Sequence, residues 1–309
     1  MCILQTLCCY DTILSADSVE WCPIEPFLDV FVCGTYNLAE DISGKSQNHR
    51  TGILFLMKFD QDMIICLKKI DMAAILDCKW CHVKINDLIL LAVVTAVGEV
   101  IIFSLEEDSS EQLELNKVTF CSISQGEIEC LALSLDWSTG RRIVDNVFLA
   151  VSDSRGYINI LQFSDKALQI KYSCKAHNFE AWIVEFDYWN TSVIFTGGDD
   201  CKLNMFDTRV STKAILSSCV HTAGVTSLRS NEKTEFMLLS GSYDEEVLLW
   251  DTRKLNHPIC RTNVGGGVWR IKWKPHTHDH ILVACMYNGF KILNNKLAIN
   301  ASYDEHESI

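Results

Sequence analysis

The sequence predicts an all-β protein that folds as a ring of repeated four-stranded sheets, a β-propeller. Three observations predict this fold: two segments repeat each other without a gap, short apolar runs recur at regular spacing, and no long segment shows helical periodicity. The chain has 309 residues, of which 48% are hydrophobic, and this is ample apolar material for a packed core.

The repeat is clearest between His177–Arg209 and His221–Arg253, which are offset by 44 residues. In each segment an Asp follows the His by 23 positions, an aromatic residue follows the Asp by six, and Asp-Thr-Arg closes the unit. This period, with a Trp-Asp pair near the end of the unit, is typical of WD40-type propeller blades.

The spacing predicts a structural role for the repeated residues. We expect the His in the loop before the innermost strand of the blade and the Asp in the turn between the second and third strands. A hydrogen bond between them then joins two loops on one rim, and the aromatic side chain of the third strand packs beneath. The residues assigned to this role are His177, Asp200, His221, Asp244 and Trp250.

A second pattern, apolar-x-x-apolar-x-aromatic, locates the innermost strand of each blade. It occurs at Ala16–Trp21, Ile75–Trp80, Ala132–Trp137, Ala181–Phe186 and Val268–Trp273, and at Val225–Ser230 with the aromatic residue lost. Six blades are therefore predicted in one domain spanning 1–309, with approximate bounds 14–70, 71–125, 126–175, 176–219, 220–263 and 264–309. The polar stretch Asn37–Thr51 is expected to be a loop of blade one, and Glu106–Gln112 an acidic loop of blade two.

The two ends of the chain predict an incomplete ring. Cys2–Cys9 is expected to be a strand, and residues 1–13 are expected to close the ring as the outer strand of the last blade. Ser302–Ile309 is a polar, acidic tail at the point where another blade would begin. We therefore expect a missing or incomplete seventh blade, with either an open gap beside blade six or Cys2–Cys9 added to the edge of blade six.

Composition excludes several kinds of partner. The chain carries 27 basic and 40 acidic residues, a net charge of −13, whereas sequence-independent binding to nucleic acid needs dense Lys and Arg. No apolar run reaches the ~18 residues of a membrane helix, and Met1–Tyr10 lacks the features of a signal peptide. The 15 cysteines are scattered, so free thiols in a reducing compartment are expected. The sequence thus predicts a cytoplasmic or nuclear monomer that binds neither nucleic acid nor membranes.

Local motifs give little support to metal or cofactor chemistry. Cys78–His82 has the C-x-x-C-H form of haem attachment, but it lies on an innermost strand where core packing is the simpler interpretation. His276, His278 and His280 alternate in a predicted loop, and a metal site there is the less favoured alternative. We expect no metal and no cofactor.

The innermost strands place charged and aromatic residues around the central channel. The fifth position of each pattern is charged, and we expect these side chains to pair: Glu20, Lys79, Asp136, Glu185, Arg229 and Lys272. Nearer one rim lie Asp17, Ser18, Asp77, Ser134, Glu180, Trp182, Trp269 and Arg270. Carboxylates beside indole rings can bind an organic cation; alternatively, Trp182 and Trp269 plug the channel.

Several blocks go beyond the generic repeat. They are Ala16–Pro23, Ile75–His82, Leu131–Gly140, Ala176–Trp182, Gly197–Asp200, Gly241–Glu245, Gly267–Trp273 and Gly289–Leu293. In order and spacing, from about residue 4 to residue 294, this set resembles the WD-repeat diphthine methylesterase family, also called diphthine methyltransferase, of diphthamide biosynthesis. Members of this family continue through another WD-like blade.

The resemblance implies a carboxylic ester hydrolase. The expected reaction is hydrolysis of the methyl ester of diphthine methyl ester on translation elongation factor 2, which gives diphthine for amidation to diphthamide. Trp182 and Trp269 would bind the quaternary ammonium group of this substrate. The candidates for the catalytic groups are Asp17, Asp77, His177, Glu180 and Arg270. Water activated by a carboxylate or His, and a Ser or Cys nucleophile, are both open routes. The alternative is a non-catalytic WD-repeat scaffold that presents its rim to partner proteins.

Overall fold

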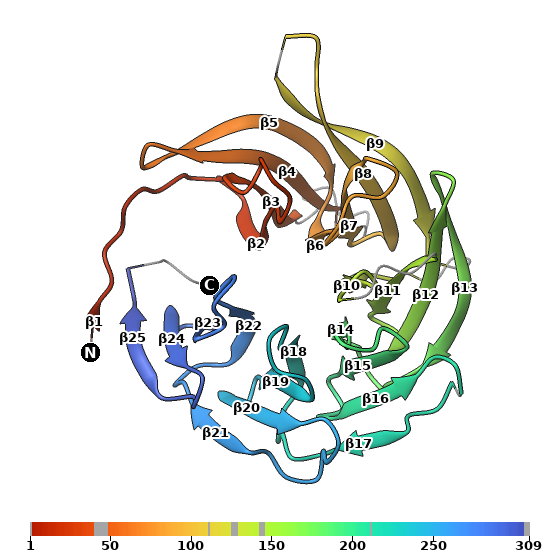
Figure 1. The fold of residues 1–309 in the computed structure, drawn as a ribbon, viewed down its shortest axis with the longest axis vertical. Helices are drawn as coiled ribbons and strands as arrows, with labels where there is room; N and C mark the ends of the chain where they lie inside the picture. The colour runs from red at the N-terminus through yellow and green to blue at the C-terminus, as the bar shows by residue number, and fades with distance from the viewer. Residues whose placement is uncertain are drawn as a thin grey trace.

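The computed structural model describes residues 2–39, 49–110, 112–124, 129–141, 146–210 and 212–305, and this part of the chain is all-β. Its strands form six sheets arranged as blades in a ring (Figure 1). The predicted fold class, a six-bladed propeller, is confirmed. None of these residues forms a helix suited to crossing a membrane.

The first three blades each contain four antiparallel strands. Blade one is β2 (Ser15–Trp21), β3 (Val30–Ala39), β4 (His49–Asp60) and β5 (Met63–Ala73). Blade two is β6 (Ile75–Trp80), β7 (Ile89–Thr95), β8 (Glu99–Glu107) and β9 (Leu113–Ser122). Blade three is β10 (Ala132–Trp137), β11 (Val147–Asp153), β12 (Tyr157–Ser164) and β13 (Ala167–Lys175).

The last three blades follow the same order from the channel outward. Blade four is β14 (Ile183–Phe186), β15 (Val193–Gly197), β16 (Leu203–Asp207) and β17 (Leu216–Ser218). Blade five is β18 (Val225–Ser230), β19 (Met237–Ser242), β20 (Glu246–Asp251) and β21 (Cys260–Asn263). Blade six is β22 (Val268–Trp273), β23 (His280–Cys285), β24 (Phe290–Asn294) and β25 (Ile299–Tyr303), with β1 (Cys2–Ile3) added outside β25.

The innermost strands pack side by side because their pattern places apolar side chains between blades. The aromatic residue that ends the pattern also makes a specific contact. Trp80 Nε1 donates to the carbonyl of Glu20 at 3.0 Å, and Trp137 Nε1 donates to the carbonyl of Lys79 at 2.9 Å. In these two blades the indole joins the blade to the backbone of the preceding one, whereas Trp273 Nε1 in blade six is buried without a hydrogen-bond partner among the described residues.

The joint between blade six and blade one differs from the others. The fourth position of the inner-strand pattern is 0–2% exposed at Cys78, Leu135, Val184, Leu228 and Ile271. In blade one the equivalent Val19 is 41% exposed and Trp21 is 46% exposed. β2 and β22 lack the packing seen between other neighbouring inner strands, and an ion pair between Lys272 and Glu20 spans this joint.

The chain ends depart in part from the prediction. Cys2–Ile3 pairs in parallel with Ala301–Ser302 at the edge of blade six, one of the two expected arrangements. The strand is shorter than the predicted Cys2–Cys9. The fourth strand of blade six comes from Ile299–Tyr303 rather than from the N-terminal segment. From β1 the chain crosses to blade one, as Figure 1 shows in red.

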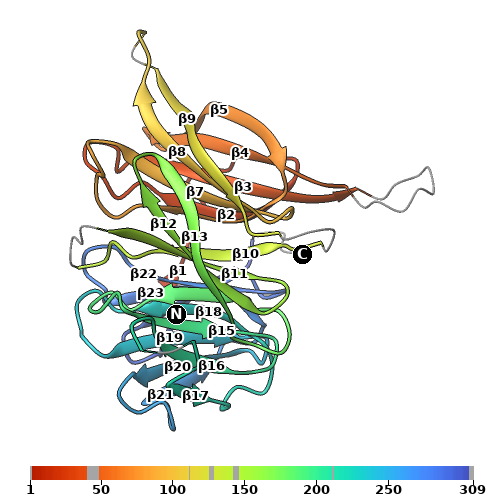
Figure 2. The ribbon, with the colours of Figure 1, turned by 90° about the vertical axis from the view of Figure 1, so that its right-hand side faces the viewer.

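The predicted loop Asn37–Thr51 is partly wrong. Asn37 pairs with Thr51, and Leu38 pairs with Arg50, so β3 and β4 continue into a hairpin. Figure 2 shows this pair of strands extending beyond the neighbouring blades. Polar composition predicted a loop, but an exposed antiparallel pair satisfies its backbone equally well with polar side chains. Residues 40–48 lie outside the described part of the chain.

Candidate functional site

Hydrogen bonds between His and Asp tie the loops of blades four and five. His177 Nδ1 lies 2.7 Å from Asp200 Oδ1, and His221 Nδ1 lies 2.9 Å from Asp244 Oδ2. The other ring nitrogens contact Thr196 Oγ1 at 2.8 Å and Ser240 Oγ at 2.7 Å. Both imidazoles are buried with both nitrogens engaged. This geometry gives His177 and His221 a structural role rather than that of a proton acceptor for a bound substrate.

The third-strand aromatic residue completes this network in blade five. Trp250 Nε1 donates to Ser240 Oγ at 2.8 Å, so Trp250, Ser240, His221 and Asp244 form one hydrogen-bonded chain. Burial raises the pKa of Asp244, but the hydrogen bond and charge of His221 outweigh it and leave the pKa below its usual value. Phe206 takes the aromatic position in blade four.

Asp77 is buried, and its carboxylate hydrogen-bonds to neighbouring blades instead of facing the mouth of the channel. Its Oδ1 accepts hydrogen bonds from Ser18 Oγ at 3.2 Å and from Cys78 N at 3.0 Å. Its Oδ2 accepts from Ser134 Oγ at 3.0 Å and from Leu135 N at 3.2 Å. Both carboxylate oxygens are thus occupied across blades one, two and three, and the geometry favours a structural role.

The structure brings four of the residues selected for function together at the mouth of the channel. Asp17, Trp182, Trp269 and Arg270 line a cavity of about 20 Å³ together with two apolar side chains, Leu76 and Leu133. These residues come from five different blades and meet because each lies at or just before the start of an innermost strand. The cavity has room for about one water molecule.

Three aromatic rings pack against one another at this mouth. Trp182 lies with ring centroids 6.0 Å from Tyr243 and 6.2 Å from Trp269, in both cases edge to face. Tyr243 and Trp269 are stacked at 6.3 Å. Trp182 Nε1 donates to Asp199 Oδ1 at 3.1 Å, which fixes the orientation of the indole. We call Trp182, Tyr243 and Trp269 the aromatic cluster.

Sequence reasoning missed Tyr243 and Asp199. Both lie in turns between the second and third strands, at blades five and four, on the rim that also carries His177 and His221. The repeat assigned these turns to the rim, so their side chains could have been included. No pattern in the sequence indicates that a turn of blade five reaches the innermost strand of blade six.

Arg270 crosses the channel mouth. Its guanidinium lies 4.9 Å from the Trp269 ring centroid. Nη1 donates to the carbonyl of Trp269 at 3.2 Å, and Nη2 donates to the carbonyl of Leu76 in blade two at 3.3 Å. Arg270 is thus held by two backbone carbonyls and one ring face.

Asp17 presents an unpaired oxygen at this site. The side chain is half-buried, and its Oδ2 is fully buried without a hydrogen-bond partner among the described residues. Burial raises the pKa of Asp17 to about 6, with Arg270 acting against the shift and Asp77 adding to it. A carboxyl group with this pKa exchanges its proton near neutral pH, as a general base must.

The mouth has an excess of negative charge. Burial raises the pKa of Tyr243 to about 12, and the carboxylates of Asp199, Asp17 and Glu180 add to the shift, while Arg270 opposes it. Glu180 lies partly buried in the loop before β14. Three carboxylates thus surround the aromatic cluster with one guanidinium among them, an arrangement that attracts a cation.

Deeper in the channel the charged residues are paired. Lys272 forms an ion pair with Glu20, and Arg229 Nη1 lies 3.5 Å from Glu185 Oε2. Asp136 accepts a hydrogen bond from the Phe186 amide at 2.8 Å. Four of the six charged side chains expected to pair thus form ion pairs, while Asp136 accepts a backbone amide instead. Burial nevertheless raises the pKa of Glu185 to about 8, with Arg229 acting against the shift.

The other motifs do not converge on a metal site. Within the described ranges, no group of three or more His, Cys, Asp or Glu side chains is placed to bind a metal ion. His278 stacks on Trp273 at 5.9 Å, whereas His280 Nδ1 contacts Asp279 Oδ1 at 3.2 Å. The Cys81 thiol is buried against Thr139.

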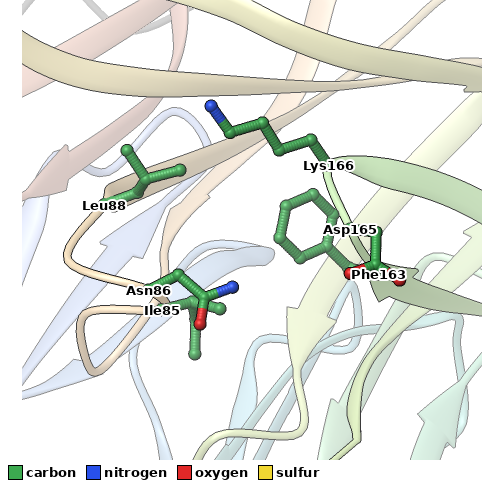
Figure 3. Close-up of a pocket in the computed structure, with 6 residues that line it drawn as sticks. All are labelled: Ile85, Asn86, Leu88, Phe163, Asp165 and Lys166. Carbon is green, nitrogen blue, oxygen red and sulfur yellow. The ribbon is translucent and has the colours of Figure 1, made fainter.

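A larger groove, of about 400 Å³, lies away from the mouth. Figure 3 shows Ile85, Asn86 and Leu88 of blade two on one side, and Phe163, Asp165 and Lys166 of blade three on the other. These loops are at the opposite ends of the strands from Asp17 and Trp269. The groove lacks the combination of ring faces and buried carboxylate that the mouth has, so the mouth is the better candidate site.

Fold and site together define a β-propeller with an acidic, aromatic mouth at one end of its channel. No family model matches the chain. The fold is shared with a chain in the crystal structure of the mitotic checkpoint complex, with a TM-score of 0.69 and 17% identity over 96% of this chain and 82% of that one. At this identity the similarity shows the fold alone.

Comparison with curated proteins identifies the family. The chain is 39% identical to diphthine methyltransferase of Mus musculus over 97% of its own length and 42% identical to that of Homo sapiens over 96%. It is 32% identical to the diphthine methyltransferase homolog of Dictyostelium discoideum, of which it covers 88%. The chain belongs to the diphthine methyltransferase family. It spans 65% of the mouse protein and 69% of the human protein.

Proposed function

We propose that this chain carries a carboxylic ester hydrolase that converts diphthine methyl ester on translation elongation factor 2 to diphthine, which is then amidated to diphthamide. The proposal rests on the composition of the mouth, together with the membership of the chain in this family. The mouth combines ring faces for a quaternary ammonium group with a buried carboxylate whose second oxygen is free to take a proton.

In the proposed reaction, Asp17 takes a proton from a water molecule whose oxygen attacks the ester carbonyl carbon. The carbonyl oxygen then gains negative charge, which Arg270 stabilises. The tetrahedral intermediate collapses and expels the methoxy group, which takes the proton from Asp17 and leaves as methanol. The product is the carboxylic acid of diphthine, which releases its proton to solvent and becomes the carboxylate, and Asp17 is again ionised. No step requires a metal.

Hydrogen bonds within the fold show which of the candidate catalytic residues are free to act on a substrate. Asp77 uses both oxygens and His177 uses both nitrogens in hydrogen bonds within the fold. Glu180 lies on the same rim as the aromatic cluster and adds negative charge near Tyr243. We therefore assign the base to Asp17, the attraction of the ammonium group partly to Glu180, and the contact with this group to Trp182 and Trp269.

The partner in this proposal is elongation factor 2, which presents its modified side chain at the rim to a single copy of the chain. The cytoplasm is the proposed compartment, because this substrate acts in translation. The fourteen cysteines from Cys8 to Cys285 are free thiols, which supports a reducing environment.

The test is methanol release from elongation factor 2 that carries diphthine methyl ester, together with loss of one methylene mass from the modified peptide. We expect Asp17→Asn to lower the rate about 100-fold, the size of a typical general-base contribution. Trp182→Ala and Trp269→Ala should lose at least ~10-fold, or about 1.4 kcal/mol. Asp60→Asn, an exposed carboxylate in blade one, is the matched control and should leave the rate unchanged.

If the folded wild-type chain releases no methanol but binds elongation factor 2, the scaffold alternative replaces the hydrolase. If Asp17→Asn retains the wild-type rate, the base is a different residue.

A further inference from the structure

The mouth is closed in this structure to anything much larger than water. Its cavity measures about 20 Å³, and the rings of the aromatic cluster pack directly against one another. A trimethylammonium group contains four heavy atoms and cannot enter this space. For the site to bind such a group, a side chain that lines the cavity must move.

Arg270 is the side chain whose position a ligand cation would take. Its guanidinium stands over Trp269 at 4.9 Å, within the ~6 Å range of a favourable cation–π contact. Its two hydrogen bonds at the mouth go to backbone carbonyls, at 3.2 and 3.3 Å. Both distances are longer than the usual ~2.9 Å, so water can replace these contacts at small cost.

Arg270 compensates the negative charge of the mouth only in part, as the environment of Asp17 shows. Asp17 Oδ2 is buried and accepts no hydrogen bond from the described residues. A buried carboxylate oxygen without a donor is costly. A quaternary ammonium has no N–H to donate, so it binds through ring faces and through charge alone. An unpaired carboxylate beside aromatic rings suits this kind of cation better than one that donates hydrogen bonds.

We propose that Arg270 is an internal substitute for the quaternary ammonium group of the proposed substrate, and that its guanidinium leaves the face of Trp269 when such a cation binds at the mouth. This inference deepens the proposed function and concerns the same site. Exchange of one cation for another keeps Asp17, Asp199 and Glu180 compensated. A neutral ligand of the same shape would leave them uncompensated, so the exchange selects for charge.

The displaced guanidinium can also stabilise the oxyanion that forms during hydrolysis. Once it leaves Trp269, Arg270 lies beside the group that the ammonium anchors, where it is free to face an ester oxygen. Binding of the cation would therefore prepare the residue that stabilises the oxyanion. The two roles predict opposite effects of removing Arg270, because cation binding should improve while hydrolysis should fall.

The test is ligand-observed NMR titration of the folded chain with tetramethylammonium and choline at constant ionic strength, with 3,3-dimethylbutan-1-ol as the neutral isostere of choline. We expect weak binding of both cations and no binding of the alcohol. Arg270→Ala should bind tetramethylammonium at least ~10-fold more tightly because it removes the internal competitor. Trp269→Ala should abolish binding.

The matched control is a second Arg–Trp pair. The guanidinium of Arg141 lies 4.4 Å from the Trp189 ring centroid, away from the mouth. Arg141→Ala should leave tetramethylammonium binding unchanged. Arg270→Met retains most of the apolar side chain and serves as a second variant if Arg270→Ala does not fold.

Equal affinity of wild-type and folded Arg270 variants for tetramethylammonium would overturn the inference, and so would equal binding of the neutral alcohol. Tighter binding by Arg270→Ala with no hydrolysis by the wild type would support the cation site and reject the hydrolase. Hydrolysis by the wild type without tighter cation binding by Arg270→Ala would support the hydrolase and reject the proposed role of Arg270 as an internal substitute.

Discussion

At the scale of single residues, position at the mouth decides which polar groups are available for chemistry. His177, Asp77 and Asp17 are all polar residues near one rim; the repeat spacing predicted a structural role for His177, but no pattern in the sequence distinguished Asp77 from Asp17. In the structure, His177 and Asp77 are satisfied by neighbours within the fold, whereas Asp17 keeps a buried oxygen without a partner among the described residues. Such an exception to hydrogen-bond satisfaction often marks a functional group.

The raised pKa of Asp17 predicts the pH dependence of hydrolysis. Burial shifts the pKa to about 6, and the base must be ionised to accept a proton. The rate should therefore rise with pH through about 6 and level off above it. Measurement of kcat/KM between pH 4.5 and 8 tests this, since a rate that stays constant over this range, as expected for a base with the ordinary carboxyl pKa of 3.8, would contradict it.

The raised pKa of Asp17 affects stability in the opposite direction: hydrolysis should increase as pH rises, whereas the contribution of Asp17 to stability decreases. A carboxyl group whose pKa is higher in the folded state than in the unfolded chain stabilises the fold when protonated. That contribution is lost as pH rises through about 6. Asp17 is therefore most favourable for stability in the pH range where it is inactive as a base, which is a cost expected of a functional residue.

At the scale of elements, the innermost strands do two things at once. Their apolar positions fill the space between blades, and in blades two and three the last aromatic residue donates a hydrogen bond to the preceding blade. Their first residues then reach the rim, where Asp17 and Trp269 face the channel. The regular pattern of the strand thus fixes the place of the irregular residues that form the site.

Removal of the indole donor tests this role of the inner strand. Trp137→Phe should lower the free energy of unfolding by roughly 1–3 kcal/mol because the carbonyl of Lys79 loses its donor inside the structure. Trp21→Phe is the matched control, since Trp21 ends the same pattern but is 46% exposed. Urea denaturation of both variants should show a clear loss for the first and a small one for the second; equal losses would argue against the contact.

At the scale of the whole molecule, the ring is held unequally around its circumference. Inner strands pack continuously from β2 to β22, while the remaining joint is spanned by the Lys272–Glu20 ion pair. Burial raises the pKa of Glu20, but Lys272, Lys79 and Arg229 outweigh this and lower it to about 2. Charge rather than apolar packing therefore holds this side of the channel.

Lys272→Met should loosen this joint selectively. The substitution leaves Glu20 half-buried without its ion-pair partner, and few apolar contacts remain to compensate. Amide hydrogen exchange should become faster in β2 and β22, with β14 on the opposite side of the ring as the internal reference (Figure 1). A uniform change across the blades would show that the ion pair has no local role at the joint.

The sequence by itself determined the all-β fold and the six innermost strands, because the inner-strand pattern recurs in each blade. It also determined the His–Asp hydrogen bonds of blades four and five, because the same spacing occurs in both. It also placed Asp17, Trp182, Trp269 and Arg270 near one opening, since each lies at or near the start of an innermost strand. The tertiary structure alone decided that Tyr243 joins the two indoles, that Asp77 is satisfied and that Arg270 stands over Trp269. These contacts join residues of different blades, and they depend on how closely the blades approach across the channel, a distance that no spacing within a single repeat encodes.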